Sequence, residues 1–240
     1  MADNTTGGAT KAMVPRLLQA GVEAPKMLLK AAIGAQLEAA AKYVKALPPR
    51  DSPGDVQATV DKVIKAHRHL ARTEGAAAGV AMSAAEMTTI VGTGGTATVP
   101  VAALTLAVDL AGLAWIQVRM VLIIAALYGH DMTDRQARTT ELGTLFGLYG
   151  AHSATAAAER TAAASQRVLK RLLMRYLKGE PLKAITAMFR MVGINFARAG
   201  LIRALPLVNI PINAAVNDAA TAALGRKARA YYGELPASHA

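Results

Sequence analysis

The chain has 240 residues, 53% of them hydrophobic but only 4% aromatic, and it contains no cysteine, which excludes disulfides, thiolate nucleophiles and cysteine metal sites. Its net charge of +11 indicates an anionic partner surface, with membrane and nucleic acid the first candidates. Alanine supplies much of the apolar content and favours helix, because it loses no side-chain entropy on ordering. Since no convincing alternating strand precedes a hairpin turn, the sequence predicts an all-α fold, a multi-helix bundle.

Residues 1–11 are polar, and we expect them to be disordered. They lack the apolar core of a secretory signal, so the expected location is cytoplasmic. Residues 12–235 are predicted to form a single helical domain, followed by a disordered end at 236–240. The first helix is expected over 24–47, and the prolines of the next segment, 48–55, predict a loop.

A second helix is predicted over about 56–74. His67 borders its apolar face as a packed residue, and a metal site is disfavoured because His67 and His69 point to different sides of a helix. Small residues dominate 75–99, which predicts a close-packed helix pair followed by a tight turn. The stretch GTGGT at 92–96 resembles a phosphate-binding loop only superficially, since it lacks a preceding strand and the P-loop lysine.

The segment from Pro100 to Tyr128 is expected to organise the fold as one long central helix. Pro100 suits a first helical turn, and Gly129 suits the position just after the last turn. A helix that is apolar on every side is buried in protein or in lipid. Asp109 and Arg119 would each cost about 2.5 to 3.5 kcal/mol at mid-bilayer, so we expect the surrounding protein to enclose this helix.

Both charges of the central helix are therefore expected to be buried polar groups. A buried Asp109 needs a hydrogen-bonding or charged partner. The sequence leaves three candidates open, which are Arg203, Asn213 and Asn217.

After the central helix, Thr133 with Gln136 fits a capping box and predicts a helix to about Tyr149. A basic amphipathic helix is expected over 153–178. Gly179 ends it, and Pro181 opens the next helix. The apolar link 205–211 then leads into a last helix over about 212–232.

Positive charge is concentrated between residues 160 and 203. Ten basic residues and one acid, Glu180, give this block a net charge of +9. Eight of the ten form the predicted anionic-surface-binding set: Arg160, Arg167, Lys170, Arg171, Arg175, Lys178, Lys183 and Arg190; the other two are Arg198 and Arg203. Each is worth about 1 kcal/mol at an anionic leaflet.

A related hypothesis places an acyl chain inside the bundle, since ligand sites in bundles lie between helices and are mostly apolar. The lining residues proposed for such a pocket are Trp115, Met120, Met188, Phe189 and Met191.

Three stretches of the sequence resemble the EcsC proteins: GTGGTATVP at 92–100 with the apolar run after it, IIAALYGHDMTD at 123–134, and the segment 205–233. Residues 209–212 depart from the family, which usually has glycine after the first proline of that link. The resemblance implies a helical, hydrophobic bacterial protein with a membrane-associated or regulatory role, and a membrane transporter as partner. It supplies no catalytic residues.

Signs of catalysis are missing from the sequence. The five histidines are scattered, and no HExxH, GxSxG or paired-carboxylate pattern occurs. We therefore expect a non-enzymatic protein without metal or cofactor. It would bind an anionic membrane from the cytoplasmic side, or a lipid ligand. The alternatives are nucleic-acid binding through the basic block and a homo-oligomeric structural protein.

Overall fold

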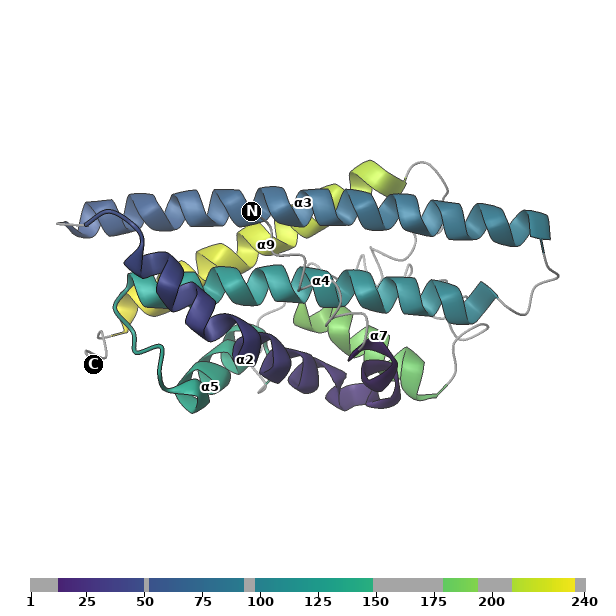
Figure 1. Cartoon of the computed structure of the whole chain (residues 1–240), viewed down its shortest axis with the longest axis horizontal. Helices are drawn as coiled ribbons and strands as arrows, with labels where there is room; N and C mark the ends of the chain where they lie inside the picture. Colours follow the sequence, from purple (N-terminus) through teal and green to yellow (C-terminus); the bar gives the residue numbers. More distant parts are fainter. Residues whose placement is uncertain (1–12, 50–51, 93–97, 149–178, 194–208, 236–240) are drawn as a thin grey trace, which may run out of the picture.

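The computed structural model describes residues 13–49, 52–92, 98–148, 179–193 and 209–235, and these residues form helices without any strand. A helical segment at 13–19 precedes the named elements (Figure 1). In chain order these are η1 (Gly21–Glu23), α2 (Ala24–Lys45), α3 (Pro53–Gly92), α4 (Thr98–Leu127), α5 (Arg135–Leu145), α7 (Glu180–Met191) and α9 (Asn209–Glu234).

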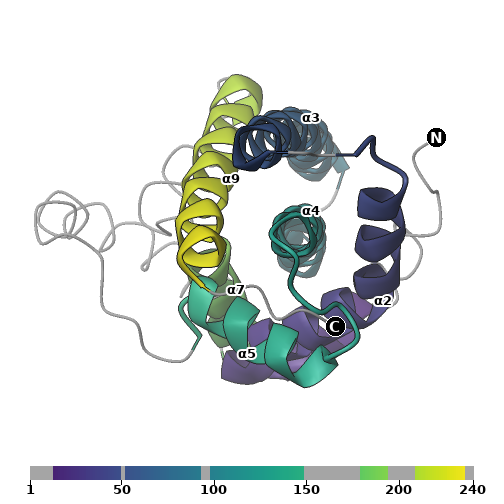
Figure 2. The same cartoon turned by 90° about the vertical axis from the view of Figure 1, so that its left-hand side faces the viewer.

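Helix α4 lies at the centre of the bundle and is surrounded by α2, α3, α5, α7 and α9 (Figure 2). Its segment Leu106–Leu127 is long and apolar enough to cross a membrane, yet 72% of that segment is buried inside the protein. The all-α prediction with an enclosed central helix is therefore confirmed. The predicted ends, Pro100 and Tyr128, fall within two residues of the observed ones, because a proline and a glycine mark them.

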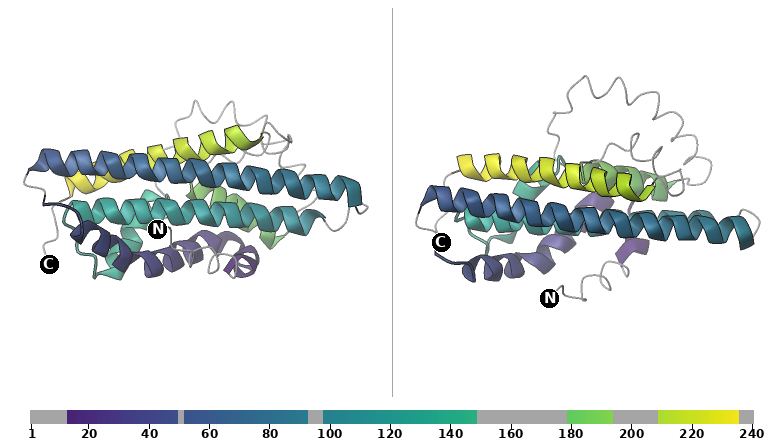
Figure 3. Two further views of the ribbon diagram at one scale, coloured as in Figure 1. Left: turned by 45° about the horizontal axis from the view of Figure 1, so that its top comes forward. Right: turned by 90° about the horizontal axis from the view of Figure 1, so that it is seen from above.

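Helices α3 and α9 pack side by side in antiparallel directions (Figure 3). Arg68 donates two hydrogen bonds of 2.9 Å to the carboxylate of Asp218. Two turns away along the same interface, Arg229 donates to Asp61 at 2.8 Å. Between these pairs Gly225 lies against Ile64, where a Cβ on the glycine would come within 2.9 Å of the isoleucine side chain. The glycine therefore permits the close approach of the two helices.

Helices α2 and α5 pack on the side of α4 that is opposite α3 and α9. Gln36 of α2 donates from Nε2 to the backbone oxygen of Trp115 at 3.0 Å. The C-terminal end of α5 is tied to α9, because Lys227 donates from Nζ to the backbone oxygen of Leu145 at 2.8 Å. A cation at that end also complements the helix dipole.

Four predicted boundaries are wrong, and one of them is the end of α5, which lies at Leu145 and not near Tyr149. Helix α3 continues to Gly92 instead of ending near residue 74, because the alanine-rich stretch supports helix and Gly75 is buried in helical packing. The cap of α5 is Asp134 and not Thr133, since Asp134 accepts from the Ala137 amide at 2.9 Å. Helix α9 begins at Asn209, so the second proline of the expected link stands in its first turn.

Two turn predictions are confirmed. Gly129 has a φ of 80°, the left-handed conformation expected after the last turn of α4. Gly179 also has positive φ, and Pro181 opens α7. The predicted helix over 153–178, the glycine-rich loop after Gly92 and both predicted disordered ends lie outside the described residues.

Candidate functional site

Two members of the predicted anionic-surface set lie in the described part of the chain. Lys183 and Arg190 are both exposed on α7, as an anion-binding role requires. Lys183 pairs with Glu180 over 2.7 Å between Nζ and Oε1, which offsets part of its charge. The other members, Arg160 to Lys178, lie outside the described residues, as do Arg198 and Arg203.

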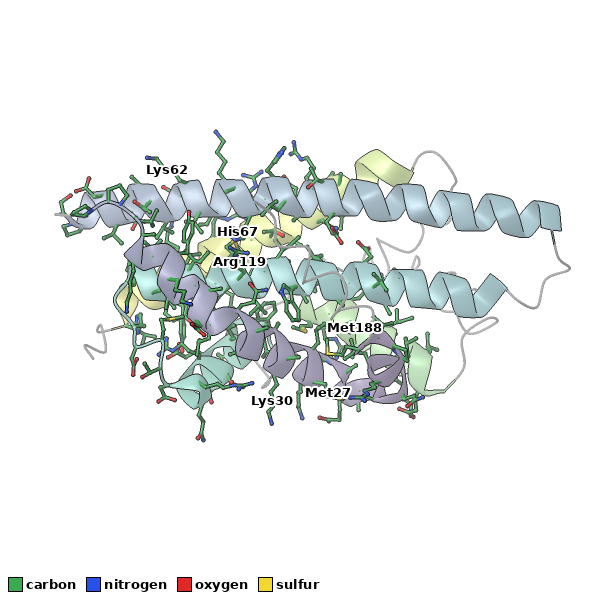
Figure 4. All side chains as sticks on the ribbon, viewed as in Figure 1. Met27, Lys30, Lys62, His67, Arg119 and Met188 are labelled. Atoms are coloured by element: carbon green, nitrogen blue, oxygen red, sulfur yellow. The ribbon has the colours of Figure 1, made fainter. Side chains whose placement is uncertain are left out.

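A surface of exposed apolar and charged side chains lies where η1 leads into α2, and Lys26 pairs there with Glu23 over 3.1 Å. Val22 and Met27 are 62% and 40% exposed, unusually high for apolar side chains. Lys26 and Lys30 are exposed between and beside them, and Met27 and Lys30 project from the same edge of the bundle (Figure 4). We call Val22, Lys26, Met27 and Lys30 the α2 corner.

The start of α7 packs against η1, next to this α2 corner. The Glu180 side chain lies directly on Gly21, a residue of η1 with φ of 56°. The residue before it, Gly179, is where the basic segment 160–178 joins the described chain. The α2 corner therefore lies beside the point from which that segment extends.

The four predicted buried polar groups have different outcomes. Asp109 is 3% exposed and Asn217 is fully buried, as predicted. The prediction for Arg119 is wrong, because its side chain is exposed. The side chain of Asn213 lies outside the described residues, as does Arg203. Asn217, the remaining candidate partner of Asp109, makes no hydrogen bond to it.

The exposure of Arg119 has a geometric cause. Within Leu106–Leu127, every residue that is not buried falls on one face of α4, at spacings of three, four or seven residues. We call this face the open stripe, and it consists of Val108, Gly112, Trp115, Ile116, Arg119 and Ala126. All except Arg119 are partly buried.

The open stripe faces the space between α2 and α3. Both helices pack on α4, but the described residues of α2 and α3 make little contact with each other (Figure 2). Leu70 of α3 is 48% exposed and lies on the side of α3 away from the α9-facing Ile64 and Arg68. Tyr43 of α2 is 41% exposed and lies two turns from Gln36 on the same face.

His67 of α3 lies beside Arg119 (Figure 4). It is 7% exposed, which confirms the prediction of a packed residue. Its Nδ1 lies 2.8 Å from the Val63 backbone oxygen, while the buried Nε2 has no hydrogen-bond partner among the described residues. Burial lowers the pKa of His67, and the charge of Arg119 lowers it further.

The five residues proposed for an apolar pocket do not face one common space. Met120, Met188, Phe189 and Met191 are buried in the core. Trp115 lies on the open stripe, on nearly the opposite side of α4 from Met120, because five residues correspond to about 500° of helical rotation. Trp115 is therefore separated from the methionines.

A polar cluster connects the end of α4 with α5 and α9. The rings of His130 and Tyr232 lie 5.0 Å apart between centroids, and Arg138 pairs with Glu141 over 2.6 Å. Burial raises the pKa of Tyr232 and lowers that of His130, which disfavours proton transfer between them near neutral pH. This cluster fastens α5 to α9, and of its four side chains only Glu141 is partly exposed, at 17%.

No His, Asp or Glu cluster suited to a metal ion occurs in the described ranges. The chain matches no protein-family model, no curated protein and no solved structure. The candidate sites therefore rest on the geometry of the α2 corner and the open stripe.

Sequence reasoning named Trp115 and Arg119 but missed that they share an open face. It placed Leu70 on the apolar face of the helix predicted over 56–74, although that side chain is 48% exposed, and it missed Tyr43 and the buried Nε2 of His67. One signal was available. A single arginine in an otherwise apolar helix marks the direction in which that helix meets water.

Proposed function

We propose that this protein associates peripherally with an anionic membrane surface and does not catalyse a reaction. The observation that carries the proposal is the +9 block between residues 160 and 203, which joins the described chain beside the α2 corner. Lysine and arginine next to apolar side chains are the pattern of surfaces that bind anionic leaflets.

The burial of α4 supports a peripheral mode. A spanning helix exposes its apolar side chains to lipid, whereas the membrane-length segment Leu106–Leu127 is mostly covered by the neighbouring helices. The surface left for contact is that of the bundle, where Val22 and Met27 can enter the interface while Lys26 and Lys30 meet lipid phosphates.

The resemblance to EcsC proteins points in the same direction, because it implies a membrane-associated role. The proposal includes the regulation of a membrane transporter, a cytoplasmic location on the inner face of the membrane, and the absence of an enzymatic activity.

Vesicle co-sedimentation tests the proposal. The full chain is expected to pellet with vesicles of phosphatidylcholine and phosphatidylserine at low salt and to dissociate from them as the salt concentration rises. It is not expected to bind vesicles of pure phosphatidylcholine. Replacing Lys170, Arg171 and Arg175 by glutamine should weaken binding by about a hundredfold, at roughly 1 kcal/mol per charge. A matched control replaces Lys62, Lys65 and Arg226, which are exposed on α3 and α9.

The apolar contribution is tested separately. Val22→Ser with Met27→Ser should weaken vesicle binding, and Leu235→Ser, which alters an apolar side chain exposed elsewhere, should not.

Equal pelleting with neutral and anionic vesicles would contradict the proposal. Retention of duplex DNA in a gel shift at physiological salt, without vesicle binding, would favour the nucleic-acid alternative. Light scattering reports whether the chain self-associates instead.

A further inference from the structure

The side of α3 that points away from the bundle is basic. Its exposed cations and one histidine lie within about 80° of rotation around the helix axis, at 3.6 residues per turn. They are Lys62, Lys65, His69 and Arg72. Lys62 projects away from α4, whereas His67 points toward it (Figure 4). From Lys62 to Arg72 this basic side extends along about 15 Å of the helix.

Helix α9 continues the same basic surface. Ile64 of α3 and Gly225 of α9 contact each other, and in each helix the next residue, Lys65 or Arg226, is exposed. Both helices pack on α4 and run antiparallel, so the turn after each contact residue leads to the same outer side of the pair. We define the outer face by five residues: Lys62, Lys65, His69, Arg72 and Arg226.

Both carboxylates in the contacting stretches 61–72 and 218–229 are paired. Asp218 accepts from Arg68 and Arg72, and Asp61 accepts from Arg229. These acids therefore offset part of the charge of the arginines and leave the lysines of the outer face uncompensated.

Three cations of the outer face take part in no ion pair among the described residues: Lys62, Lys65 and Arg226. With the three paired arginines they make six cations against two carboxylates, a net charge of +4. Lys227 is not counted, because it donates to the backbone oxygen of Leu145 of α5. A surface of one sign attracts a ligand of the opposite sign.

The remaining side chains of this surface are small. Ala219 and Ala223 are exposed beside Arg226. Leu70, the nearest exposed large apolar residue, lies on the side of α3 turned away from α9. A membrane-binding surface carries apolar side chains that enter the lipid, and a protein interface is enriched in aromatic residues and depleted of lysine. The outer face therefore fits a ligand that is recognised by its charge alone.

Double-stranded DNA presents negative charge at high density. It carries one charge per about 1.7 Å of axis, so about nine phosphates accompany the length from Lys62 to Arg72. Single strands are held by aromatic stacking, and bases and 2′-hydroxyls are read by amide and hydroxyl side chains. The stretches 61–72 and 218–229 contain no Phe, Tyr, Trp, Asn, Gln or Ser, and their one threonine, Thr221, is buried.

We infer that the outer face binds the phosphate backbone of double-stranded DNA without sequence preference. Lys62, Lys65 and Arg226 each contact a phosphate. This activity is separate from membrane association, which uses the basic block at 160–203 and the α2 corner.

Fluorescence anisotropy of a labelled duplex tests the inference on the full chain. The logarithm of the binding constant is plotted against the logarithm of the salt concentration. Replacing Lys62, Lys65 and Arg226 by glutamine should lower the steepness of this plot by about 3, near 0.9 per lost phosphate contact, and weaken binding more than about tenfold. A single strand of the same length should bind more weakly than the duplex.

The basic block provides a charge-matched control. Replacing Lys170, Arg171 and Arg175 by glutamine removes the same charge, and this variant should keep the steepness for duplex DNA within about 1 of the wild type. The outer-face variant should in turn bind anionic vesicles like the wild type. All three side chains changed on the outer face are exposed, so the substitutions leave the core intact.

A gain of affinity is expected from Asp61→Asn, which releases Arg229 to contact a phosphate and should increase the steepness by about 1. Glu38→Gln releases Lys42 on α2 in the same way and should have no such effect. Equal losses in the two triple variants would overturn the inference, because net charge would then hold the DNA. Tighter binding of the single strand, or no change in Asp61→Asn, would also overturn it.

Discussion

The two sides of α4 are built differently. Toward α9, the polar side chains of Gln117, Asn217 and Thr221 are fully buried, and Gln117 donates to Thr221 at 3.4 Å and to the Val192 backbone oxygen at 3.2 Å. Toward the space between α2 and α3, Trp115 and Arg119 keep contact with water. The buried side contributes to the stability of the fold, whereas the open side leaves Trp115 and Arg119 accessible to solvent.

Helix α3 takes part in both sides, and its residues divide accordingly. Ile64, Arg68 and Arg72 contact α9, whereas His67 and Glu74 lie against α4. One helix can serve both purposes because its faces are separated by helical rotation. Substitutions on each face test this difference between the two sides.

The largest effect is expected at Gly225. In Gly225→Val the added carbons collide with Ile64, whose side chain would lie 2.9 to 3.2 Å from the first of them. Overpacking of this kind costs about 1 to 3 kcal/mol of unfolding free energy, measurable by denaturant titration. Gly54→Val is the control, since a Cβ there meets only Ser52, at 3.6 Å. Ile64→Ala combined with Gly225→Val should cost less than the sum of the two, and strict additivity would refute the contact.

A smaller effect is expected at Asp218, which accepts from both Arg68 and Arg72. Asp218→Asn should lower the unfolding free energy by about 1 kcal/mol, because the two arginine side chains are 41% and 56% exposed and water screens the pairs. The loss should shrink at high salt. Asp61→Asn removes a more exposed pair with Arg229 and should cost less than about 0.5 kcal/mol. Equal losses at the two aspartates would contradict the ranking.

The buried His67 predicts a pH dependence. Burial holds its pKa below the ordinary value of 6.5, so in the window just below pH 6.5 the unfolded chain takes up a proton that the folded chain does not. Stability is therefore full above pH 6.5 and falls as pH drops toward the folded pKa. The histidine of the α5–α9 cluster, His130, is shifted the same way and contributes with the same sign.

Unfolding midpoints measured on either side of pH 6.5 check this. His67→Gln should flatten the slope by the share that this histidine contributes, because a tenfold lower proton affinity of the folded state corresponds to about 1.4 kcal/mol of unfolding free energy. A slope that His67→Gln leaves unchanged would mean that the ring is accessible to protons in the folded chain.

The smallest effects on stability are expected on the open side. Arg119→Gln and Leu70→Ser should each change the unfolding free energy by less than about 0.5 kcal/mol, because both side chains are exposed and touch little. A loss above about 1 kcal/mol in either variant would show that the stripe is part of the core.

The sequence predicted well what depends on local chemistry. Pro100 and Gly129 mark the ends of the central helix because their backbone preferences act within one turn. The burial of Asp109 followed from the cost of a charge in an apolar helix, and the packed state of His67 from the apolar face beside it.

What depends on packing between distant helices was not predicted. Arg119 looks equivalent to Asp109 in sequence, and only the positions of α2 and α3 separate the exposed charge from the buried one. Trp115 and Met120 are close in sequence but face opposite ways, so grouping them in one pocket was wrong. The extension of α3 past residue 74 was missed because glycine and alanine suit both a tight turn and close helix packing.

The central claim is that the bundle itself encloses the segment Leu106–Leu127 of α4 and, within that segment, leaves only the open stripe accessible to water. Because the chain has no cysteine, single cysteines can be placed along α4 and labelled in the native protein with a water-soluble maleimide. Arg119→Cys and Ile116→Cys are expected to react quickly, whereas Gln117→Cys and Val121→Cys are expected to react only after unfolding. Equal rates at all four positions, or protection of all four, would contradict the claim.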